Sequence, residues 1–285
     1  MQEPPSVLTR ARALILMMRL PNCFMIGFAV VVGEVIASQV VPANAAFFGF
    51  MAGFMLLGAA MVLNDYFDRE IDSINAPERP IPSNRVKPSQ AVSFAVILAS
   101  IGFLCATVTG VLTSIVAIFS IILTVAYNSR FKKMGLVGNS MVSANVAVPF
   151  IYGGFAVGNG SWPLLIFSLL AFLSSLGREI VKGIVDVTGD KVKGVNSVAV
   201  AKGSSYAARQ GATLFLIAVV MSVLPLILHM VSFYYVPLVL ICDMGFLLTS
   251  YSIVTNPTPY NAKRSKKYVL VWMTFGLLAF VLGTL

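Results

Sequence analysis

Long apolar stretches separated by short polar segments dominate the sequence. No charged residue occurs in 88–129 or in 134–177. Each stretch is about twice the roughly 20 residues that a transmembrane helix needs, so each predicts two helices joined by a turn. The first turn is expected at 109–110 and the second at 158–163, where glycines and a proline interrupt the apolar pattern.

The rest of the chain extends this pattern. The opening stretch 13–64 turns around 38–44, and the stretch 210–262 breaks near 229–232. The last apolar stretch, 268–285, is long enough for one helix. Four hairpins and a single helix predict an all-α membrane protein with nine transmembrane helices.

Composition agrees with this interpretation. Hydrophobic residues make up 58% of the 285 residues, charged residues 11%, and the mean hydropathy is +0.89. About a quarter of the residues of a soluble domain are charged. A soluble fold could not bury this much apolar surface, so we expect one integral membrane domain over 1–285, surrounded by lipid.

The basic residues predict an orientation rather than a nucleic-acid site. The net charge is +9, but the charges lie in short segments between apolar stretches and form no solvated basic domain. With a cytoplasmic N-terminus, all 20 Lys and Arg fall at the N-terminus or after spans two, four, six and eight. This distribution follows the positive-inside rule. It predicts a multi-pass cell-membrane protein with its C-terminus outside.

The polar segments also indicate an internal repeat. Asp-x-x-x-Asp occurs at 68–72 after span two and at 186–190 after span six. Tyr-Asn recurs in the segments after spans four and eight. One four-helix unit used twice, at about 13–133 and 134–267, would explain both pairs.

The first acidic cluster is suited to holding a metal ion. On a helix, Asn64, Asp65, Asp68 and Asp72 lie within an arc of about 100°. Carboxylates at this spacing repel one another unless they are paired or bound to metal. Oxygen ligands without His or Cys suit Mg²⁺, which commonly joins one or two carboxylates to substrate phosphates.

The second cluster combines acids with cations. If its helix continues, Arg178, Glu179, Lys182, Asp186 and Asp190 share a face of about 120°, although the glycine before Asp190 is expected to end the helix there. A solvated loop whose charges balance one another is the alternative. Two such clusters on the same membrane side favour a site, with Asp186 and Asp190 as further metal ligands.

Basic side chains beside the clusters are candidates for binding a diphosphate. Topological anchoring accounts for many of the other cations. The nearest candidates are Arg79, Arg130, Lys132, Arg178, Lys182 and Lys191. The expected pure anchors are Lys263, Arg264, Lys266 and Lys267.

Asn64-Asp65-x-x-Asp68-x-x-x-Asp72 followed by Asp186-x-x-x-Asp190, on nine spans, resembles the UbiA superfamily of intramembrane prenyltransferases. The resemblance covers nearly the whole chain. It implies a helical bundle around a central cavity, with a side opening to lipid. It also implies that the two Asp-rich motifs bind a Mg²⁺-diphosphate.

Three further segments, 19–25, 127–133 and 177–183, resemble the archaeal digeranylgeranylglyceryl phosphate synthases within that superfamily. This resemblance implies transfer of a geranylgeranyl group from geranylgeranyl diphosphate to geranylgeranylglyceryl phosphate in ether-lipid synthesis. Much of the superfamily has Tyr-x-x-x-Lys after span four. Here Phe131 is four residues after Tyr127, so either Arg130 or Lys132 takes the lysine role.

These residues predict a mechanism in which Asp68, Asp72, Asp186 and Asp190 are catalytic and hold the Mg²⁺ ions that bridge the diphosphate. Metal and cations would stabilise the leaving group, and a dry cavity would protect the allylic cation. The base that takes the acceptor's proton is either a motif carboxylate or the departing diphosphate.

A lipid-phosphate acceptor needs a second cationic site. Arg19, close to Asn22 in span one, is the candidate, and snorkelling of Arg19 to the interface is its alternative. Two more charges fall within spans. Glu34 is expected to reach the outer interface, and Asp243 to face the bundle interior with a polar partner.

Two other functions compete with this hypothesis. One is a UbiA-type prenyltransferase with an aromatic acceptor, as in quinone synthesis. The other is a secondary transporter, but transporter sites lie near the membrane midplane, whereas these acidic clusters lie at one face. The sequence does not indicate an oligomeric state.

Overall fold

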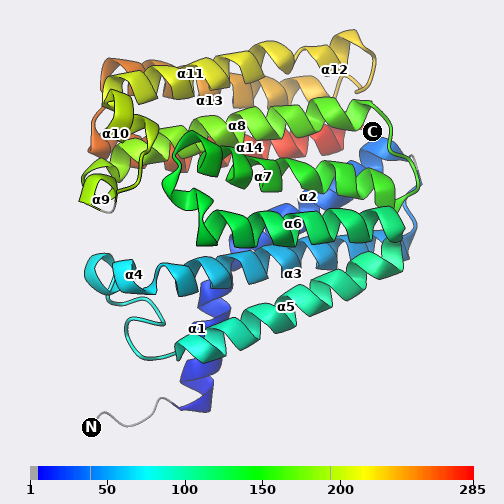
Figure 1. Cartoon of the computed structure of the whole chain (residues 1–285). Coiled ribbons are helices and arrows are strands. Elements are labelled where there is room, and N and C mark those ends of the chain that lie inside the picture. The colour runs from blue at the N-terminus through cyan, green and yellow to red at the C-terminus, as the bar shows by residue number, and fades with distance from the viewer. Residues whose placement is uncertain (1–5, 39, 193) are drawn as a thin grey trace.

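The computed structural model describes residues 6–38, 40–192 and 194–285, and over these residues the chain is helical and contains no strand. The long helices lie side by side in a bundle (Figure 1). They are α2 (Leu20–Ala37), α3 (Ala43–Phe67), α5 (Pro88–Thr109), α6 (Val111–Ser129), α7 (Leu136–Ala156), α8 (Pro163–Val185), α11 (Ser204–Met221), α13 (Tyr235–Thr255) and α14 (Pro259–Gly283). The short elements are α1 (Val7–Met18), α4 (Arg69–Asn75), α9 (Val187–Val192), α10 (Val198–Lys202), α12 (Leu224–Ile227) and the 3₁₀-helix η1 (Phe131–Lys133).

Eight of the long helices in the described residues are long and apolar enough to cross a membrane. The long helix outside this set is α7, which carries the polar residues Asn139, Ser143 and Asn145 along its length. It has 21 residues, as many as α13, and packs against α2, α6 and α8. The prediction of an all-helical membrane protein is confirmed, while the count of nine spans stays a prediction.

The predicted turns lie where the apolar pattern places them. α5 ends at Thr109 and α6 begins at Val111, with Gly110 between them at a φ of 142°. Residues with a side chain rarely adopt this backbone conformation, so glycine is suited to the turn. α7 ends and α8 begins on either side of the predicted turn at 158–163.

The first span differs from the prediction. Its helix is interrupted at Arg19, which has a left-handed φ of 55°, so that α1 ends there and α2 begins. Pro21 in the first turn of α2 explains the break, because proline lacks the amide hydrogen that a continuous helix would use. α1 runs at a steep angle to the long helices and buries Ala13, Met17 and Met18 (Figure 1).

The last helix is longer than predicted. α14 begins at Pro259, where Thr258 accepts a hydrogen bond from the amide of Asn261 as the N-cap. Its first turns therefore include the basic segment 263–267, which lies outside the predicted apolar stretch 268–285.

α2 and α7 are in backbone contact. A Cβ on Gly33 would collide with the backbone of Phe150, and one on Gly153 would collide with the backbone of Val30. Cavities lie on both sides of this pair. The first is lined by α2, α3, α5, α6 and α7, the second by α2, α7, α8, α11, α13 and α14. The α2–α7 pair is therefore the wall between two largely apolar cavities.

The two charges within spans behave differently. Glu34 is fully buried rather than at the interface, and neither of its carboxylate oxygens has a hydrogen-bond partner among the described residues. It points at Gly49, whose missing side chain leaves room for the carboxylate. Asp243 has the polar partner that was predicted, because it lies 2.7 Å from the Ser222 hydroxyl and lines the second cavity.

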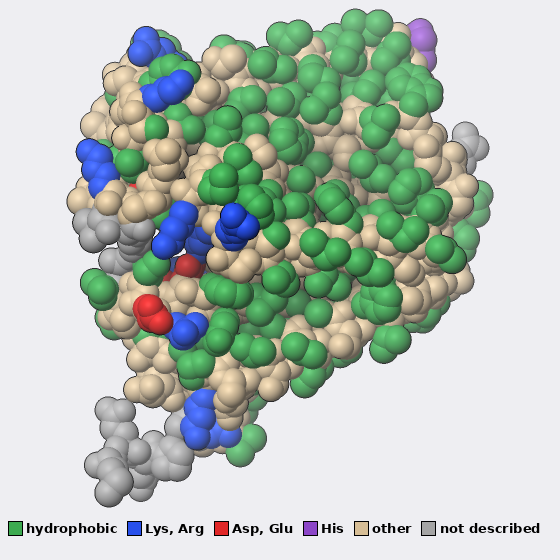
Figure 2. Space-filling model, in the orientation of Figure 1, with side chains coloured by type: hydrophobic (Ala, Val, Ile, Leu, Met, Phe, Trp, Pro, Cys, Tyr) green, Lys and Arg blue, Asp and Glu red, His purple; other side chains and the backbone are tan. Residues whose placement is uncertain are grey.

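Polar and apolar side chains are segregated along the bundle. Figure 2 shows Lys and Arg concentrated at the end that carries α4, α9 and α10, and hydrophobic side chains covering the flank of the long helices. The chain is thus a multi-pass membrane protein with a basic end.

Candidate active site

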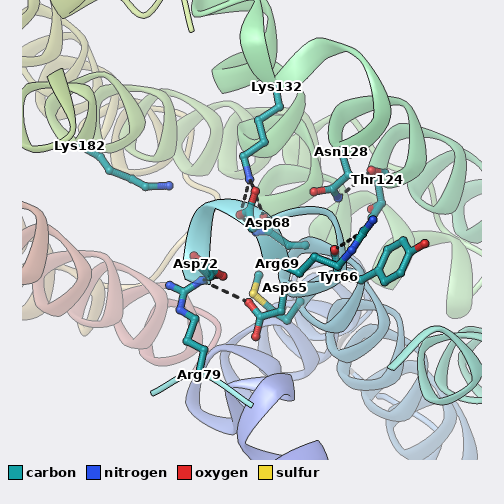
Figure 3. Close-up of polar contacts among 12 residues, drawn as sticks. Asp65, Tyr66, Asp68, Arg69, Asp72, Arg79, Thr124, Asn128, Lys132 and Lys182 are labelled. Carbon is teal, nitrogen blue, oxygen red and sulfur yellow. Dashed lines mark hydrogen bonds and ion pairs between the residues drawn. The ribbon is translucent and has the colours of Figure 1, made fainter. Parts of the chain in front are cut away.

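The first acidic cluster lies at the junction of α3 and α4. Asp68 separates the two helices, yet its amide bonds to the Asn64 carbonyl at 2.9 Å, and the Asp72 amide bonds to the Asp68 carbonyl at 2.8 Å. These bonds carry the helical register across the junction. Asn64, Asp68 and Asp72 therefore stay on one face, as their spacing predicts. Figure 3 shows Asp68 and Asp72 at this junction, with Asp65 nearby.

Lys132 reaches this face from the 3₁₀-helix after α6. Its Nζ lies 2.5 and 2.6 Å from the two carboxylate oxygens of Asp68 and 3.2 Å from the Asn64 side-chain oxygen. Burial lowers the pKa of Lys132, although the charge of Asp68 opposes the change. Arg130 is exposed. Of the two cations beside Phe131, Lys132 is therefore the one that contacts the cluster.

Two arginines bind the remaining carboxylates of the cluster. Arg79 lies 2.5 Å from Asp72 and 3.7 Å from Asp65, and Arg19 lies 2.8 Å from Asp65. Burial acts to lower the pKa of Arg79, but the hydrogen bond and the charge of Asp72 outweigh burial and raise it. Asn22 is half-buried in the first turn of α2, where its amide bonds to the Arg19 carbonyl.

The second cluster lies at the end of α8. Glu179 is buried and accepts hydrogen bonds from Arg178 at 3.0 Å and Lys182 at 3.1 Å. The helix is interrupted at the exposed Asp186 rather than before Asp190, and Asp190 lies within α9, its amide bonded to the Asp186 carbonyl. The predicted shared face is thus divided between α8 and α9. Lys191, also in α9, is exposed.

The two clusters face each other around Tyr127. Lys132 lies 6.0 Å from the centre of the Tyr127 ring, and the charges of Lys182, Asp68 and Asp190 all act on the Tyr127 hydroxyl. Figure 3 shows Lys182 extending toward the turn that carries Asp68. Residues more than a hundred positions apart in the sequence therefore border one site at the basic end of the bundle.

Lys266 belongs to this site, although the sequence analysis assigned it to anchoring. Its carbonyl accepts a hydrogen bond from Arg178 at 3.2 Å, its side chain is half-buried, and the charges of Asp186 and Lys182 act on its ammonium group. The other three basic residues of 263–267 are exposed. The signal was present in the sequence, since Ala262, Ser265 and Val269 mark a buried helical face that runs beside Lys266.

The donor set suits a hard cation completed by substrate. Within the described part of the chain, no three acidic, His or Cys side chains converge into a ready-made metal site. Asp68 and Asp72 nevertheless offer oxygen ligands on one face, and Mg²⁺ usually binds through one or two carboxylates plus substrate phosphates. The residues present therefore fit Mg²⁺ bound together with a phosphorylated substrate.

Both cavities are lined by residues that lie close in sequence to this site. The first cavity reaches Leu63, next to Asn64, and Thr124, one turn before Asn128. The second reaches Ser174, one turn before Arg178 on α8. A lipid whose polar head group binds at the basic end could thus place its apolar chain in the cavity on either side of the α2–α7 pair.

Known proteins share this architecture. The UbiA prenyltransferase family matches residues 26–282. A digeranylgeranylglyceryl phosphate synthase of Methanopyrus kandleri is 38% identical over 275 residues, covering 96% of this chain and 100% of that protein. A solved structure of a digeranylgeranylglyceryl phosphate synthase has a TM-score of 0.79 at 30% identity, covering 96% and 98% of the two chains. A UbiA homologue from Archaeoglobus fulgidus bound to DMAPP and Mg²⁺ has a TM-score of 0.68 at 16% identity, covering 96% and 99%.

Proposed function

The chain belongs to the UbiA prenyltransferase family, and from that premise we propose that it transfers a geranylgeranyl group from geranylgeranyl diphosphate to the glycerol hydroxyl of geranylgeranylglyceryl phosphate. This is a step of archaeal ether-lipid synthesis. The observation that carries the proposal is one charged site with two apolar cavities beside it in the bundle. Such a site matches a reaction that joins two lipid substrates at their head groups. The names of the similar synthases support the same substrates.

The proposed topology has nine spans, with α7 as the span of lowest hydropathy. α7 is surrounded by α2, α6 and α8, so its polar side chains can be buried in protein rather than exposed to lipid. The N-terminus and the active site face the cytoplasm and the C-terminus lies outside the cell, because the basic residues gather at the end of the bundle that carries the site.

Donor binding rests on the first cluster and on the facing residues of the second. Asn64, Asp65, Asp68 and Asp72, together with Asp186 and Asp190 from the other side, would hold Mg²⁺ and the diphosphate. Mg²⁺ supplies neutralisation of the charge that develops on the leaving group. The carboxylates would hold this ion without His or Cys, as expected for a hard cation.

Lys132 and Arg79 donate hydrogen bonds to the diphosphate oxygens. Lys132 forms an ion pair with Asp68, and Arg79 forms one with Asp72. Both cations are therefore already held where the negative charge of the leaving diphosphate would develop. Arg130 and Lys191 are exposed at the rim, where their charge attracts anionic head groups.

The allylic cation forms where the cavity excludes water. The first cavity begins beside Asn64 and is lined mainly by aliphatic side chains, so it takes the donor's prenyl chain. Tyr127 stands at the mouth between the two clusters and offers a ring face to positive charge. The proton of the acceptor hydroxyl goes to a motif carboxylate or to an oxygen of the departing diphosphate.

The test is a competition between acceptors. Purified protein receives geranylgeranyl diphosphate and Mg²⁺ with geranylgeranylglyceryl phosphate and 4-hydroxybenzoate together, and products are identified by mass spectrometry. We expect doubly prenylated glyceryl phosphate. A prenylated benzoate would instead assign an aromatic acceptor. The absence of both products from folded protein would contradict the proposed substrates.

A further inference from the structure

In the second cluster, one described carboxylate is in direct contact with the cations. In the first cluster, Arg19, Arg79 and Lys132 each form an ion pair with a carboxylate of that cluster. Around Glu179 there are also three cations, but the bonds of Arg178 and Lys182 converge on this single buried carboxylate.

Lys266 differs from the other two cations. It forms no ion pair with a described carboxylate within 4 Å, and Asp186, which acts on it electrostatically, is exposed at the end of α8. Asp190, the third acid of the cluster, lies in α9 beyond the helix interruption. Among the described carboxylates of the cluster, Glu179 is therefore the one in direct contact with these cations, and the ammonium group of Lys266 is suited to an anionic ligand.

We propose that Arg178, Lys182 and Lys266 form the binding subsite for the phosphate monoester of the acceptor. The inference rests on the proposed function, because it assumes an acceptor that carries a phosphate. A phosphate monoester has a charge of about −1.5 to −2 at pH 7 and offers three oxygens to such a cluster.

Glu179 explains why these cations are placed for a ligand. Its side chain is only 8% exposed, whereas those of Arg178 and Lys182 are 28% and 43% exposed. The buried carboxylate thus holds the inner edge of the two cations and leaves their outer edge accessible. Because α14 begins at Pro259, Lys266 approaches from a second helix, and Arg178 ties the two helices together through the Lys266 carbonyl.

The second cavity lies close to this cluster along both helices. Ser174 on α8 and Met273 on α14 line the second cavity, one turn from Arg178 and two turns from Lys266. A lipid whose phosphate binds these cations can therefore extend its chain into the second cavity. The donor chain then occupies the first cavity, on the other side of the α2–α7 wall.

Arg19 is less suited to this role. One terminal nitrogen of its guanidinium is bonded to Asp65, and the other lies 3.4 Å from the Met61 sulfur. Binding a phosphate there would compete with a buried carboxylate. Among the described residues, no carboxylate forms an ion pair with Lys266 that a phosphate would have to displace.

The test compares Lys266→Gln with Lys267→Gln, its exposed neighbour on α14. Steady-state kinetics are measured with geranylgeranylglyceryl phosphate varied at saturating donor, and then with geranylgeranyl diphosphate varied at saturating acceptor. We expect Lys266→Gln to raise the acceptor KM about 10-fold or more, since a charged hydrogen bond is lost. The donor KM of Lys266→Gln should stay near the wild-type value, as should both KM values of Lys267→Gln. Lys266→Arg should restore part of the acceptor affinity.

Three results would overturn the assignment. A rise in the donor KM alone would place the diphosphate at Lys266. Equal changes in Lys266→Gln and Lys267→Gln would show a general surface-charge effect. If Arg19→Gln raised the acceptor KM and Lys266→Gln left it unchanged, the acceptor phosphate would be assigned to Arg19 instead. The unchanged donor KM serves as the control for folding, and a wild-type enzyme without glyceryl phosphate product would instead contradict the proposed function itself.

Discussion

The two acidic clusters share the spacing Asp-x-x-x-Asp but differ in how their charges are arranged. At the α3–α4 junction, three carboxylates are matched by three cations from other segments of the chain. At the end of α8, one buried carboxylate organises cations, while Asp186 and Asp190 lie beyond the helix interruption. Equal spacing therefore does not mean equal chemistry. The first cluster offers oxygen ligands for a metal, and the second brings three cations together around one buried carboxylate.

Removing the metal should have the largest effect, because it acts on both clusters together. Chelation with EDTA is expected to abolish prenyl transfer, since the cations alone do not neutralise a diphosphate held among carboxylates. Product formation is followed by mass spectrometry during back-titration with Mg²⁺. Full activity in EDTA would mean that the first cluster works through its cations alone. The proposed difference between a metal-binding first cluster and a cationic second cluster would then be wrong.

Asp68→Asn should come next. Loss of this carboxylate is expected to lower kcat about 10²- to 10³-fold, comparable to removing a group that stabilises a transition state. The matched control is Glu70→Gln, because Glu70 is exposed and two residues away. If the two variants had equal activity, Asp68 would have no special role in the first cluster.

Lys132→Gln tests the cation at the same carboxylate. We expect the donor kcat/KM to fall about 10- to 100-fold because a charged hydrogen-bond donor is lost, with little change in the acceptor KM. Arg130→Gln is the control, since Arg130 is exposed beside the same 3₁₀-helix. A larger loss in Arg130→Gln would reverse the roles of the two cations.

Glu179→Gln should have the smallest effect and should separate the clusters most clearly. The amide can still accept hydrogen bonds, but it no longer neutralises Arg178 and Lys182. We expect a fall of about 1–3 kcal/mol in the free energy of unfolding and a change in the acceptor KM only. Thermal unfolding and the two KM values are the measurements. A change confined to the donor KM would instead indicate that both clusters bind the donor.

Sequence periodicity was sufficient for the parts of the fold that depend on local chemistry. The turn at Gly110 and the shared face of Asn64, Asp68 and Asp72 are confirmed because each depends on neighbouring residues. The repeat at 13–133 and 134–267 stays a prediction.

Contacts between distant segments could not be read from the sequence in the same way. The break at Arg19 is not of this kind, because it follows from the neighbouring Pro21 and could have been predicted from the sequence. The position of Lys266 depends on where α14 begins and on its contact with Arg178, 88 residues earlier in the chain. A basic segment also looks the same in sequence whether it anchors a helix or faces a site. The burial of Glu34 depends on the missing side chain of Gly49 on the next helix.

The backbone contact between α2 and α7 bears on product release. Since Gly33 and Gly153 leave no room for a side chain between these helices, the two chains of a product could not exchange cavities at this level. A product with one chain in each cavity would straddle the α2–α7 pair and would have to leave past the end of this pair. α2 begins at Arg19, beside the first cluster, where the chain turns away into α1. The break between α1 and α2 would then lie next to the exit of the product.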